Sequence, residues 1–537
     1  MQSQKKRLPI GIQTFSELRK DNAYYYVDKT KKIIELINVS KYIFLSRPRR
    51  FGKSLTIDTI AELFLGNQSL FKGLYAEHNW DWEYTYPVLR ISFGIGVSSK
   101  SISFMTYLSE ILSSIEERYS IDNHQYSMGI RFEKIIRHCY QTSGKKVVIL
   151  IDEYDKPILD NLSHQDKAIS VRNEMRDFYS VIKNNDAYIH FAMLTGVSRF
   201  SKINLFSGLN NLYDVTLDDR FSALCGYTQD ELEHVFAPEL FDVDLDKLKT
   251  WYNGYNWTGD SVYNPFDVLL FLSNPQKLYK NYWIETGSAT FLMDKLLNEQ
   301  FNIQQAIGRL IDNQQLSQFE IGDISTTALL FQAGYLTIDK MILRPSLRFT
   351  LKFPNLEVQQ SLSESLLLKY ISCANDDMLL KQGQLYEAVL AHNLPAIQEI
   401  ITAFFASIPH HWHRNNPIAS YEGYWASVFY ALFASLGLRT ITEDATNFGT
   451  IDMTLIVDGE NNKHYVYIFE FKVIDKDNNQ DNDTPQGIAL AQIKNKRYAD
   501  KYLTANNIVH EIGIEFHKET RATLFDIATN HQEQKTP

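Results

Sequence analysis

The segment Arg47-Pro48-Arg49-Arg50-Phe51-Gly52-Lys53-Ser54 lies between an apolar run, Tyr42–Leu45, and a helical pattern, Leu55–Phe64. A strand, a tight Gly-Lys-Ser turn and a helix in this order are typical of a loop that binds nucleotide phosphates. Backbone N–H groups at the helix start hold the phosphates, the lysine reaches the β- and γ-phosphates, and the serine hydroxyl binds Mg²⁺. The segment therefore predicts a nucleotide site centred on this turn.

The start of the segment departs from the usual phosphate-loop pattern. That pattern begins with a glycine separated by four residues from Gly-Lys, and Arg47 stands at this position here. Arg47, Arg49 and Arg50 crowd the loop, and two interpretations stay open. The arginines neutralise a triphosphate, or they pair with acidic neighbours as a solvated rim.

A second motif supports the nucleotide site. The apolar run Val147–Ile151 ends in Asp152-Glu153, which puts two carboxylates at the carboxyl end of a strand. In a nucleotide hydrolase Asp152 binds Mg²⁺ through water and Glu153 orients the attacking water. The alternative is a surface pair of acidic residues after a core strand.

A third motif follows the apolar run Ile189–Leu194. Thr195 or Ser198 is positioned to sense the γ-phosphate, and Arg199 to approach its charge. The alternative is an ordinary turn between a strand and a helix. Whether Arg199 or Arg220 acts as an arginine finger, in its own chain or in a neighbouring one, stays open.

The organisation of the chain predicts an α/β fold in three parts. Apolar strands alternate with helical patterns in residues 1–220, which predicts a P-loop domain with a parallel sheet and helices on both faces. Residues 221–384 form a mainly helical middle domain, in which helix 325–332 and two extended runs suggest a winged-helix-like element. Residues 385–537 form a third, α/β domain, with helices expected at 385–403, 421–436 and 488–502.

The third domain contains a second group of charged residues. Asp452 lies within the expected strand Gly449–Val457, and Glu470 and Lys472 within His464–Lys472. Side chains alternate along a strand, so Glu470 and Lys472 share one face, and an antiparallel hairpin brings Asp452 beside Glu470. Charges inside apolar strands are costly unless they are paired or bind a metal. The group predicts a Mg²⁺ site at Asp452 and Glu470, with Lys472 activating water for attack on a phosphodiester.

Flanking residues extend this second group. Glu422 upstream offers a further carboxylate, and Gln492 and Tyr498 downstream lie on a helical pattern rich in lysine and arginine. Such cations suit a phosphate backbone. The alternative for the group is a salt-bridged pair of strands at a sheet edge.

The composition is that of a soluble globular protein. The chain has 537 residues, a net charge of -10 and 44% hydrophobic residues. The net charge does not suggest a protein coated in nucleic acid, although it permits a local basic groove. Its three cysteines lie far apart, which favours a reducing, cytoplasmic location over a disulfide framework. No run of about 18 apolar residues and no signal peptide are evident, so we expect no membrane partner.

Both groups together resemble the bacterial and archaeal family of AAA-ATPase-like proteins with a C-terminal PD-(D/E)XK nuclease domain. The resemblance covers nearly the whole chain and rests on Phe15–Arg19, Tyr26–Thr30, Arg47–Ser54, Ile151–Pro157, Leu194–Phe200, Phe206–Leu212, Trp251–Tyr255, Tyr263–Pro265, Phe353–Asn355 and Glu357–Val358. In such proteins the arginine-rich start replaces the usual glycine, so Arg47 fits the family. Thr450 stands where the family often has arginine before the first carboxylate.

The resemblance implies a restriction-endonuclease-like third domain, ATP and Mg²⁺ as cofactors, and DNA or RNA as a partner. The expected nucleotide-binding residues are Arg49, Arg50, Phe51, Gly52, Lys53, Ser54, Leu55, Asp152 and Thr195, with Ser54 and Asp152 as metal ligands. The expected catalytic residues are Glu153, Asp452, Glu470 and Lys472. We thus predict an ATPase coupled to a nuclease, with further copies of the same chain as partners in a homo-oligomer. The alternative is a nucleotide-dependent switch or scaffold with an inactive nuclease-like domain.

Overall fold

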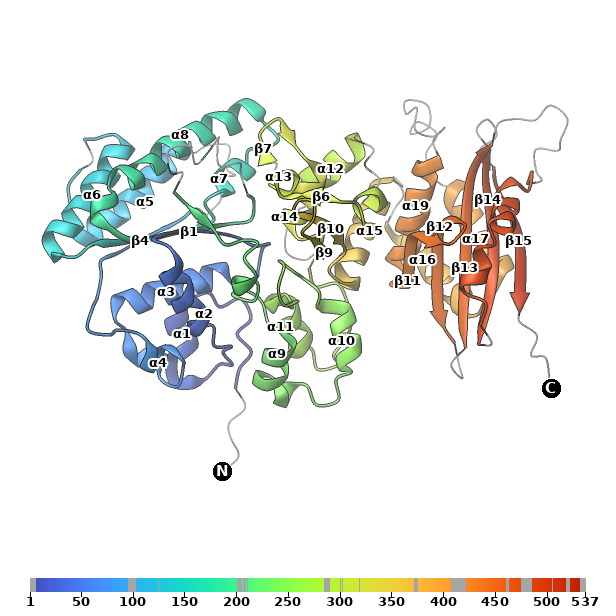
Figure 1. The fold of residues 1–537 in the computed structure, drawn as a ribbon, viewed down its shortest axis with the longest axis horizontal. Coiled ribbons are helices and arrows are strands. Elements are labelled where there is room, and N and C mark those ends of the chain that lie inside the picture. The colour runs from blue at the N-terminus through green and yellow to red at the C-terminus, as the bar shows by residue number, and fades with distance from the viewer. Residues whose placement is uncertain are drawn as a thin grey trace. The chain divides into compact units, whose positions relative to one another are not determined.

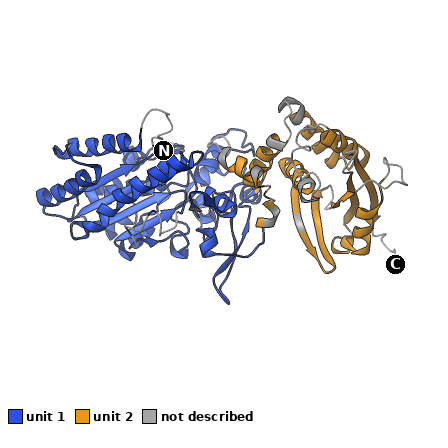
Figure 2. Ribbon diagram, turned by 90° about the horizontal axis from the view of Figure 1, so that it is seen from above, with its two compact units in different colours: residues 1–282, 308–355 blue, residues 283–307, 356–537 orange. Residues whose placement is uncertain are grey.

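The computed structural model describes residues 6–94, 103–123, 125–199, 205, 209, 211–283, 290–299, 301, 303–317, 319–370, 375–406, 422–459, 463–474, 485–504, 506–517 and 522–531. The chain forms two compact units, one of residues 1–282 and 308–355 and one of residues 283–307 and 356–537 (Figure 2). The middle of the sequence thus contributes to both units, and the division into three domains stays a prediction.

The first unit contains a five-stranded sheet in the order β2-β3-β4-β1-β5. All its strand pairs are parallel, as the alternation of strands and helices predicted. The strands are β1 (Tyr42–Ser46), β2 (Val88–Ser92), β3 (Val147–Asp152), β4 (Ile189–Gly196) and β5 (Tyr213–Asp214). Every residue of β1 and β3 is buried, because helices cover both faces of the sheet.

The helices of this sheet fall into two layers (Figure 1). The helices are α1 (Phe15–Arg19), α2 (Thr30–Val39), α3 (Lys53–Leu65), α4 (Ala76–Asn79), α5 (Phe104–Tyr119), α6 (Met128–Ser143), α7 (Lys156–Leu159) and α8 (Gln165–Asn184). Helices α5, α6 and α8 lie on one face, and α1 to α4 lie on the other. The α/β fold with a P-loop-like parallel sheet is confirmed.

The remainder of the first unit is mainly helical. It contains α9 (Gln229–Val235), α10 (Leu245–Tyr252), α11 (Pro265–Ser273), α13 (Asn313–Leu316), α14 (Thr326–Ala333), β6 (Ile311–Asp312), β7 (Phe319–Glu320), β8 (Asp323–Ile324), β9 (Thr337–Ile342) and β10 (Arg348–Lys352). Helix α14 is followed by the antiparallel hairpin β9–β10, the order expected for a winged-helix-like element. Its C-cap, Gly334, has φ 90°, a conformation that glycine adopts without strain.

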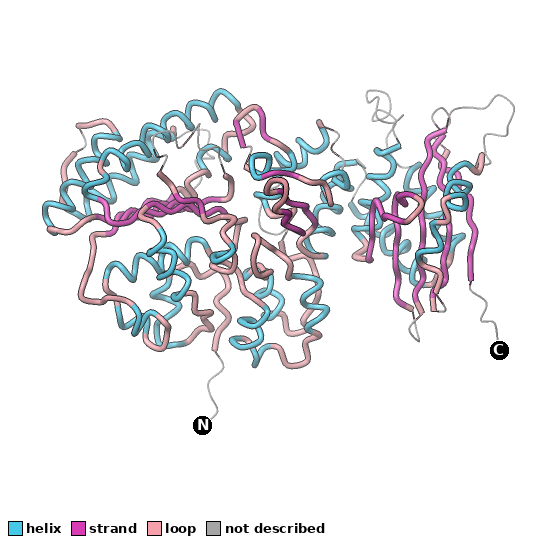
Figure 3. Tube along the Cα trace, in the orientation of Figure 1, coloured by secondary structure: helices cyan, strands magenta, loops and turns pink. Residues whose placement is uncertain are grey.

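The second unit contains a mixed sheet in the order β11-β12-β13-β14-β15. Figure 3 draws the strands of this sheet in magenta. Its elements are α12 (Thr290–Asn298), α15 (Leu356–Tyr370), α16 (Asn375–Leu390), α17 (Leu394–Ala406), α19 (Glu422–Ser435), α20 (Ile488–Asn495), β11 (Arg439–Thr446), β12 (Gly449–Asp458), β13 (His464–Ile474), β14 (Asn507–His517) and β15 (Thr523–His531). Only the β13–β14 pair is parallel among these neighbours.

Helices cover both faces of this sheet. Phe429 of α19 contacts Phe469 and Phe471 of β13, with ring centroids 5.7 and 4.9 Å apart. Helix α20 packs against β13 and β14. Gln492 of α20 contacts Glu470, which alternates with the two phenylalanines along β13, so α20 lies on the opposite face from α19.

Two predicted helices of this unit differ from the structure. The expected helix 385–403 is broken at His392, which has φ 54°, between α16 and α17. Asn393 caps the second helix by accepting a bond from the N–H of Ala396, and Pro395 favours a helix start at this point. The expected helix 488–502 ends at Asn495, and Arg497 has φ 49° before a short 3₁₀ turn.

Among the residues that the structure describes, none of the helices is long and apolar enough to cross a membrane.

Candidate functional sites of the two units

The phosphate loop joins β1 to α3. Gly52 is the N-cap of α3 and has φ 89°, a left-handed conformation that favours glycine. A Cβ added to Gly52 would meet no atom within 4 Å, so backbone geometry rather than space calls for glycine here. The N–H groups at the start of a helix have no partners inside the helix, and such helix starts commonly bind anions.

Lys53 is held by its own loop. Its side chain is buried, and its Nζ donates to the carbonyl oxygens of Arg47 and Pro48 at 3.0 and 2.9 Å. Burial lowers the pKa of Lys53, and the nearby carboxylate of Asp152 is the largest opposing influence. The lysine and the first carboxylate of the second motif therefore lie near enough for their charges to interact.

Asp152 and Thr195 meet at the carboxyl ends of β3 and β4. The Thr195 hydroxyl donates to Asp152 Oδ1 at 2.6 Å, and the N–H of Tyr154 donates to the Thr195 carbonyl at 3.0 Å. The Ser198 hydroxyl donates to Asp155 instead. The bond from Thr195 orients the Asp152 carboxylate, and contact of either hydroxyl with a phosphate stays a prediction.

Glu153 has an unusual backbone conformation, with φ 53°. Its N–H donates to Asp152 Oδ1 at 3.0 Å, so the aspartate stabilises the turn that positions the glutamate. Burial raises the pKa of Glu153, the Asp152 charge raises it further, and Lys53 opposes both. A carboxylate with a raised pKa is suited to accept a proton. We call Lys53, Ser54, Asp152, Glu153 and Thr195 the front site.

Arg47 and Arg50 of the loop make different contacts. Arg47 is buried, donates to the carbonyls of Ser46, Thr216 and Phe221, and lies 4.2 Å from the ring centroid of Trp257. Neither interpretation from the sequence therefore holds for Arg47, which packs inside the fold. Arg50 lies 3.9 Å from the ring centroid of Phe266.

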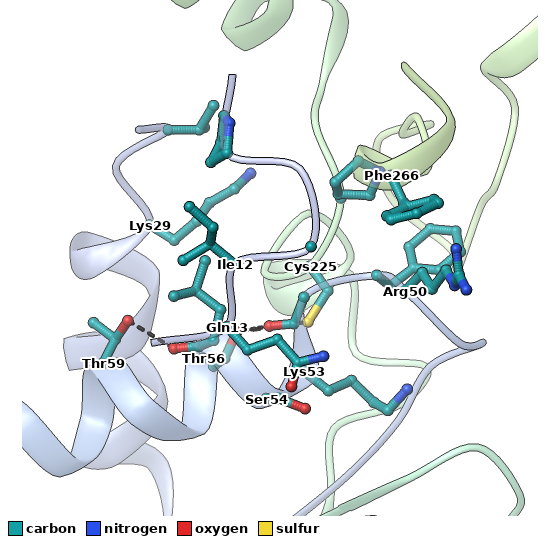
Figure 4. A pocket seen from close by; sticks show the side chains of 18 of the residues that line it. Ile12, Gln13, Lys29, Arg50, Lys53, Ser54, Thr56, Thr59, Cys225 and Phe266 are labelled. Atoms are coloured by element: carbon teal, nitrogen blue, oxygen red, sulfur yellow. Dashed lines mark hydrogen bonds between the residues drawn. The ribbon is translucent and has the colours of Figure 1, made fainter. Parts of the chain in front are cut away.

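A pocket of about 480 Å³ opens beside the loop (Figure 4). Seven of the nine expected nucleotide-binding residues line it: Arg49, Arg50, Phe51, Gly52, Lys53, Ser54 and Leu55. Glu153 lines it as well, whereas Asp152 and Thr195 are not among the residues that line it. The pocket thus joins the phosphate loop to the expected water-orienting carboxylate.

Residues distant in the sequence complete this pocket. They include Ile12, Gln13, Lys29, Cys225 and Phe266, which surround the start of α3 in Figure 4. Lys29 Nζ pairs with Glu231 at 2.5 Å, which fixes this wall of the pocket. Sequence reasoning did not assign these residues to the site, although Lys29 lies in one of the motifs that carried the family resemblance.

Both candidate arginine fingers form ion pairs. Arg199 Nε lies 2.7 Å from Asp214 and its guanidinium also donates to Asn313, at 3.0 Å. Arg220 pairs with Asp218 at 2.6 Å. Either arginine would have to exchange an aspartate for a phosphate to act as a finger.

The charged group of the second unit lies on β12 and β13. Met453 pairs with Phe469 in the antiparallel register, so Asp452 and Glu470 occupy the next positions along the two strands. Asp452 Oδ2 accepts a bond of 2.8 Å from the N–H of Phe471, and Lys472 Nζ lies 3.3 Å from Glu470 Oε1. The structure thus brings Asp452, Glu470 and Lys472 together, and we call them the rear site.

Helix α20 and the 3₁₀ turn that follows it each supply one polar group to the rear site. Gln492 Nε2 donates to Glu470 Oε1. Burial raises the pKa of the Tyr498 hydroxyl, a hydrogen bond with Gln492 opposes this, and the charges of Glu470 and Asp452 raise it further. Both carboxylates therefore lie near enough to Tyr498 for their charges to act on its hydroxyl.

The donor sets of both sites fit Mg²⁺. This ion keeps several waters and commonly binds through one or two carboxylates, and Asp452 and Glu470 offer two. Among the described residues, no group of three or more His, Cys, Asp or Glu side chains forms a metal cage. The side chain of Glu422 lies outside the described part of α19, so its contribution stays a prediction.

Comparisons with known proteins agree with this division of sites. Residues 9–206 match the family described as predicted AAA-ATPase, and residues 420–525 match the PD-(D/E)XK nuclease superfamily. A protein of Azotobacter chroococcum mcd 1, described as an uncharacterized protein in the vnfD 5' region, is 50% identical over 522 residues. This match covers 97% of the present chain and 98% of that protein. The chain therefore belongs to the family of predicted AAA-ATPase-like proteins that carry a C-terminal domain of the PD-(D/E)XK nuclease superfamily.

Proposed function

We propose that the chain binds and hydrolyses ATP at the front site and cleaves nucleic acid at the rear site, both with Mg²⁺. One observation carries the proposal: each unit brings a lysine and two carboxylates together, as phosphoryl-transfer chemistry requires. Magnesium would supply charge neutralisation at the phosphate oxygens in both sites.

At the front site the N–H groups at the start of α3 bind the triphosphate. Lys53 exchanges the carbonyls of Arg47 and Pro48 for phosphate oxygens, which offer a full negative charge. Ser54 and Asp152 are the metal ligands of this proposal. Glu153 accepts the proton of the attacking water, a role that its raised pKa suits.

At the rear site Asp452 and Glu470 are the residues that would hold Mg²⁺, and the ion would neutralise charge on the scissile phosphate. Lys472 orients the attacking water and stabilises the negative charge that develops on the phosphate. Gln492 restrains Glu470 through its hydrogen bond. The cations of the segment after α20 then attract the sugar–phosphate backbone.

ATP hydrolysis tests the front site. We expect Lys53→Ala to lower turnover by roughly 100-fold or more, because the charge that stabilises the transferred phosphoryl group is lost. Phosphate release measures this. Lys41→Ala is the matched control, since Lys41 pairs with Asp186 near the other end of β1. Unchanged turnover in Lys53→Ala would refute ATP hydrolysis at this loop.

Cleavage of labelled DNA and RNA with Mg²⁺ or Mn²⁺ tests the rear site. Asp452→Ala is expected to abolish cleavage while ATP turnover persists. Asp458→Ala, at the exposed end of the same strand, is its control. Cleavage that survives Asp452→Ala would point to a contaminating nuclease.

A nucleotide-dependent switch with an inactive nuclease-like domain is the second candidate. Thr450 favours it, because this position often carries arginine in the family and threonine lacks a charge to contact phosphate. Nucleic acid bound with metal but left intact at every ATP concentration would support the switch over the nuclease.

A further inference from the structure

We infer that Glu515 is a positioning residue of the rear site: it secures the first turn of α20 and thereby sets Gln492 against Glu470. The catalytic consequence of this inference rests on the proposed nuclease function. The structural part is that a carboxylate on one strand fixes a helix, and that this helix carries a polar group to the site. It rests on the contacts of β13, β14 and α20.

Glu515 caps α20 from outside the helix. Its side chain is 1% exposed, and it accepts bonds from the N–H groups of Gln486, Ile488 and Ala489 at 2.5, 2.6 and 3.2 Å. A helix start leaves such donors without partners inside the helix, and a negative charge there is favourable. The local sequence offers no substitute, because the N-cap Gly487 has no side chain to accept these bonds.

The register of β13 and β14 puts this cap beside the rear site. Lys472 pairs with Glu515, and Glu470 pairs with Gly513, in the parallel ladder. Paired residues of neighbouring strands point to the same face of the sheet. Glu515 therefore lies on the face that carries the charged residues of β13 and receives α20.

Gly513 lets α20 approach this face closely. A Cβ at residue 513 would lie 2.4 Å from the backbone nitrogen of Leu490, a distance that no side chain tolerates. The first turn of α20 is thus held in two ways: it rests on the bare backbone of Gly513, and its N–H groups are bonded to Glu515. Neither restraint alone determines both the height and the rotation of the helix.

The restraint reaches the rear site through Gln492. This residue lies one helical turn beyond Ile488, on the same side of the helix, so its position follows that of the capped turn. Its Nε2 donates to Glu470 Oε1, the oxygen that also contacts Lys472 Nζ. A first turn that frays or rotates moves the amide of Gln492 away from this oxygen.

Four variants test the inference in the full chain: Glu515→Gln, Gln492→Ala, their combination, and Glu511→Gln. Glu515→Gln nearly keeps the shape but replaces one acceptor oxygen by an NH₂ group that faces N–H donors. We expect it to lower Mn²⁺-dependent cleavage by roughly 10-fold, the range of effects for groups that orient metal ligands. Gln492→Ala should have a similar effect.

The combination separates positioning from stability. Because Glu515 acts through Gln492, the double variant should be no slower than the slower single variant, measured below the melting temperature of each protein. Glu511→Gln should leave cleavage unchanged. Glu511 is also buried on β14, but its side chain bonds to Asn530 on β15. Single effects that multiply, or a Glu515→Gln variant that melts earlier yet cleaves normally, would overturn the inference.

Hydrogen exchange and Mn²⁺ titration keep the inference testable without nuclease activity. Faster exchange of the Ile488 and Ala489 amides in Glu515→Gln, together with about 10-fold weaker Mn²⁺ binding, supports it. Unchanged exchange overturns it. Wild-type protein that neither cleaves nor binds Mn²⁺ refutes the proposed function of the rear site, and the exchange rates then decide on the positioning of α20 alone.

Discussion

The front site and the rear site combine the same kinds of side chain, yet they hold them differently. In the front site Lys53 bonds to carbonyls of its own loop, and Asp152 bonds to a hydroxyl of the neighbouring strand. In the rear site Glu470 contacts Lys472 and Gln492 directly. The front site is centred on a backbone turn, whereas the rear site and Gln492 together form a cluster of side chains from β12, β13 and α20.

This difference has a physical origin. A backbone turn depends on the conformation of adjacent residues, such as the left-handed Gly52. A cluster of side chains depends on strand register and on the seat of α20, which involve residues far apart in the chain. Local substitutions should therefore affect chemistry in the front site, and substitutions distant from the charged residues should affect the rear site.

The largest expected effect concerns Glu153 of the front site. Glu153→Gln should lower ATP turnover by roughly 100-fold or more, because the amide cannot accept a proton from water. Binding of a fluorescent ATP analogue should remain, since the phosphate loop is intact. Glu35→Gln, an exposed position on α2, is the control. Turnover retained in Glu153→Gln would remove Glu153 from the proposed chemistry.

The next effect separates the arginines of the loop. Arg47→Ala should lower the free energy of unfolding by about 2–4 kcal/mol, because three buried carbonyls lose their donor and Trp257 loses its partner. Calorimetry of the thermal transition measures it. Arg49→Ala, at an exposed position, should change stability by less than about 0.5 kcal/mol. Equal effects of the two substitutions would contradict the interior role of Arg47.

A smaller effect tests the close packing of α20 on Gly513. Gly513→Ala should destabilise the second unit by about 1–3 kcal/mol, since the added methyl group overlaps the backbone of Leu490. Gly383→Ala is the matched control, because its Cβ would meet no atom within 4 Å and alanine favours the interior of α16. The control should gain about 0.5–1 kcal/mol. Urea unfolding monitored by hydrogen exchange compares the stabilities of the two variants.

The smallest effect is a pH dependence of the front site. The pKa of Glu153 is raised in the folded protein, so the folded state binds more protons than the unfolded state between the ordinary and the raised pKa. Stability of the wild type should therefore fall as pH rises through this window, and Glu153→Gln should lack this contribution. The melting temperature of Glu153→Gln should exceed that of the wild type by more at pH 7.5 than at pH 4.5. A gap independent of pH would contradict this.

Much of the first sheet could be predicted, because buried parallel strands are continuous apolar runs. The apolar run Val147–Ile151, for example, coincides with β3 except for the last residue of that strand, Asp152. Strand β14 was missed although its residues from Val509 to His517 are all buried. It contains His510, Glu511 and Glu515, and polar residues in a buried strand conceal its apolar pattern.

Sequence reasoning found the charged residues of both sites but not what surrounds them. In the sequence Arg47 stands where a phosphate ligand is expected, and only its packing on Trp257 in the folded chain shows that it lies in the interior. Ile12, Gln13 and Phe266 belong to the pocket because tertiary folding gathers them at α3. No short-range pattern connects such distant residues.

The sequence by itself determined the phosphate loop, the acidic strand end and the alternation that puts Glu470 and Lys472 on one face of β13. These features arise from neighbouring residues and from the fixed periods of helix and strand. Tertiary structure alone decided the packing of α20 on β13 and β14, the walls of the pocket and the cap that Glu515 provides. Those features depend on strand register and helix packing, which are set by the free energy of the whole fold and not by adjacent residues.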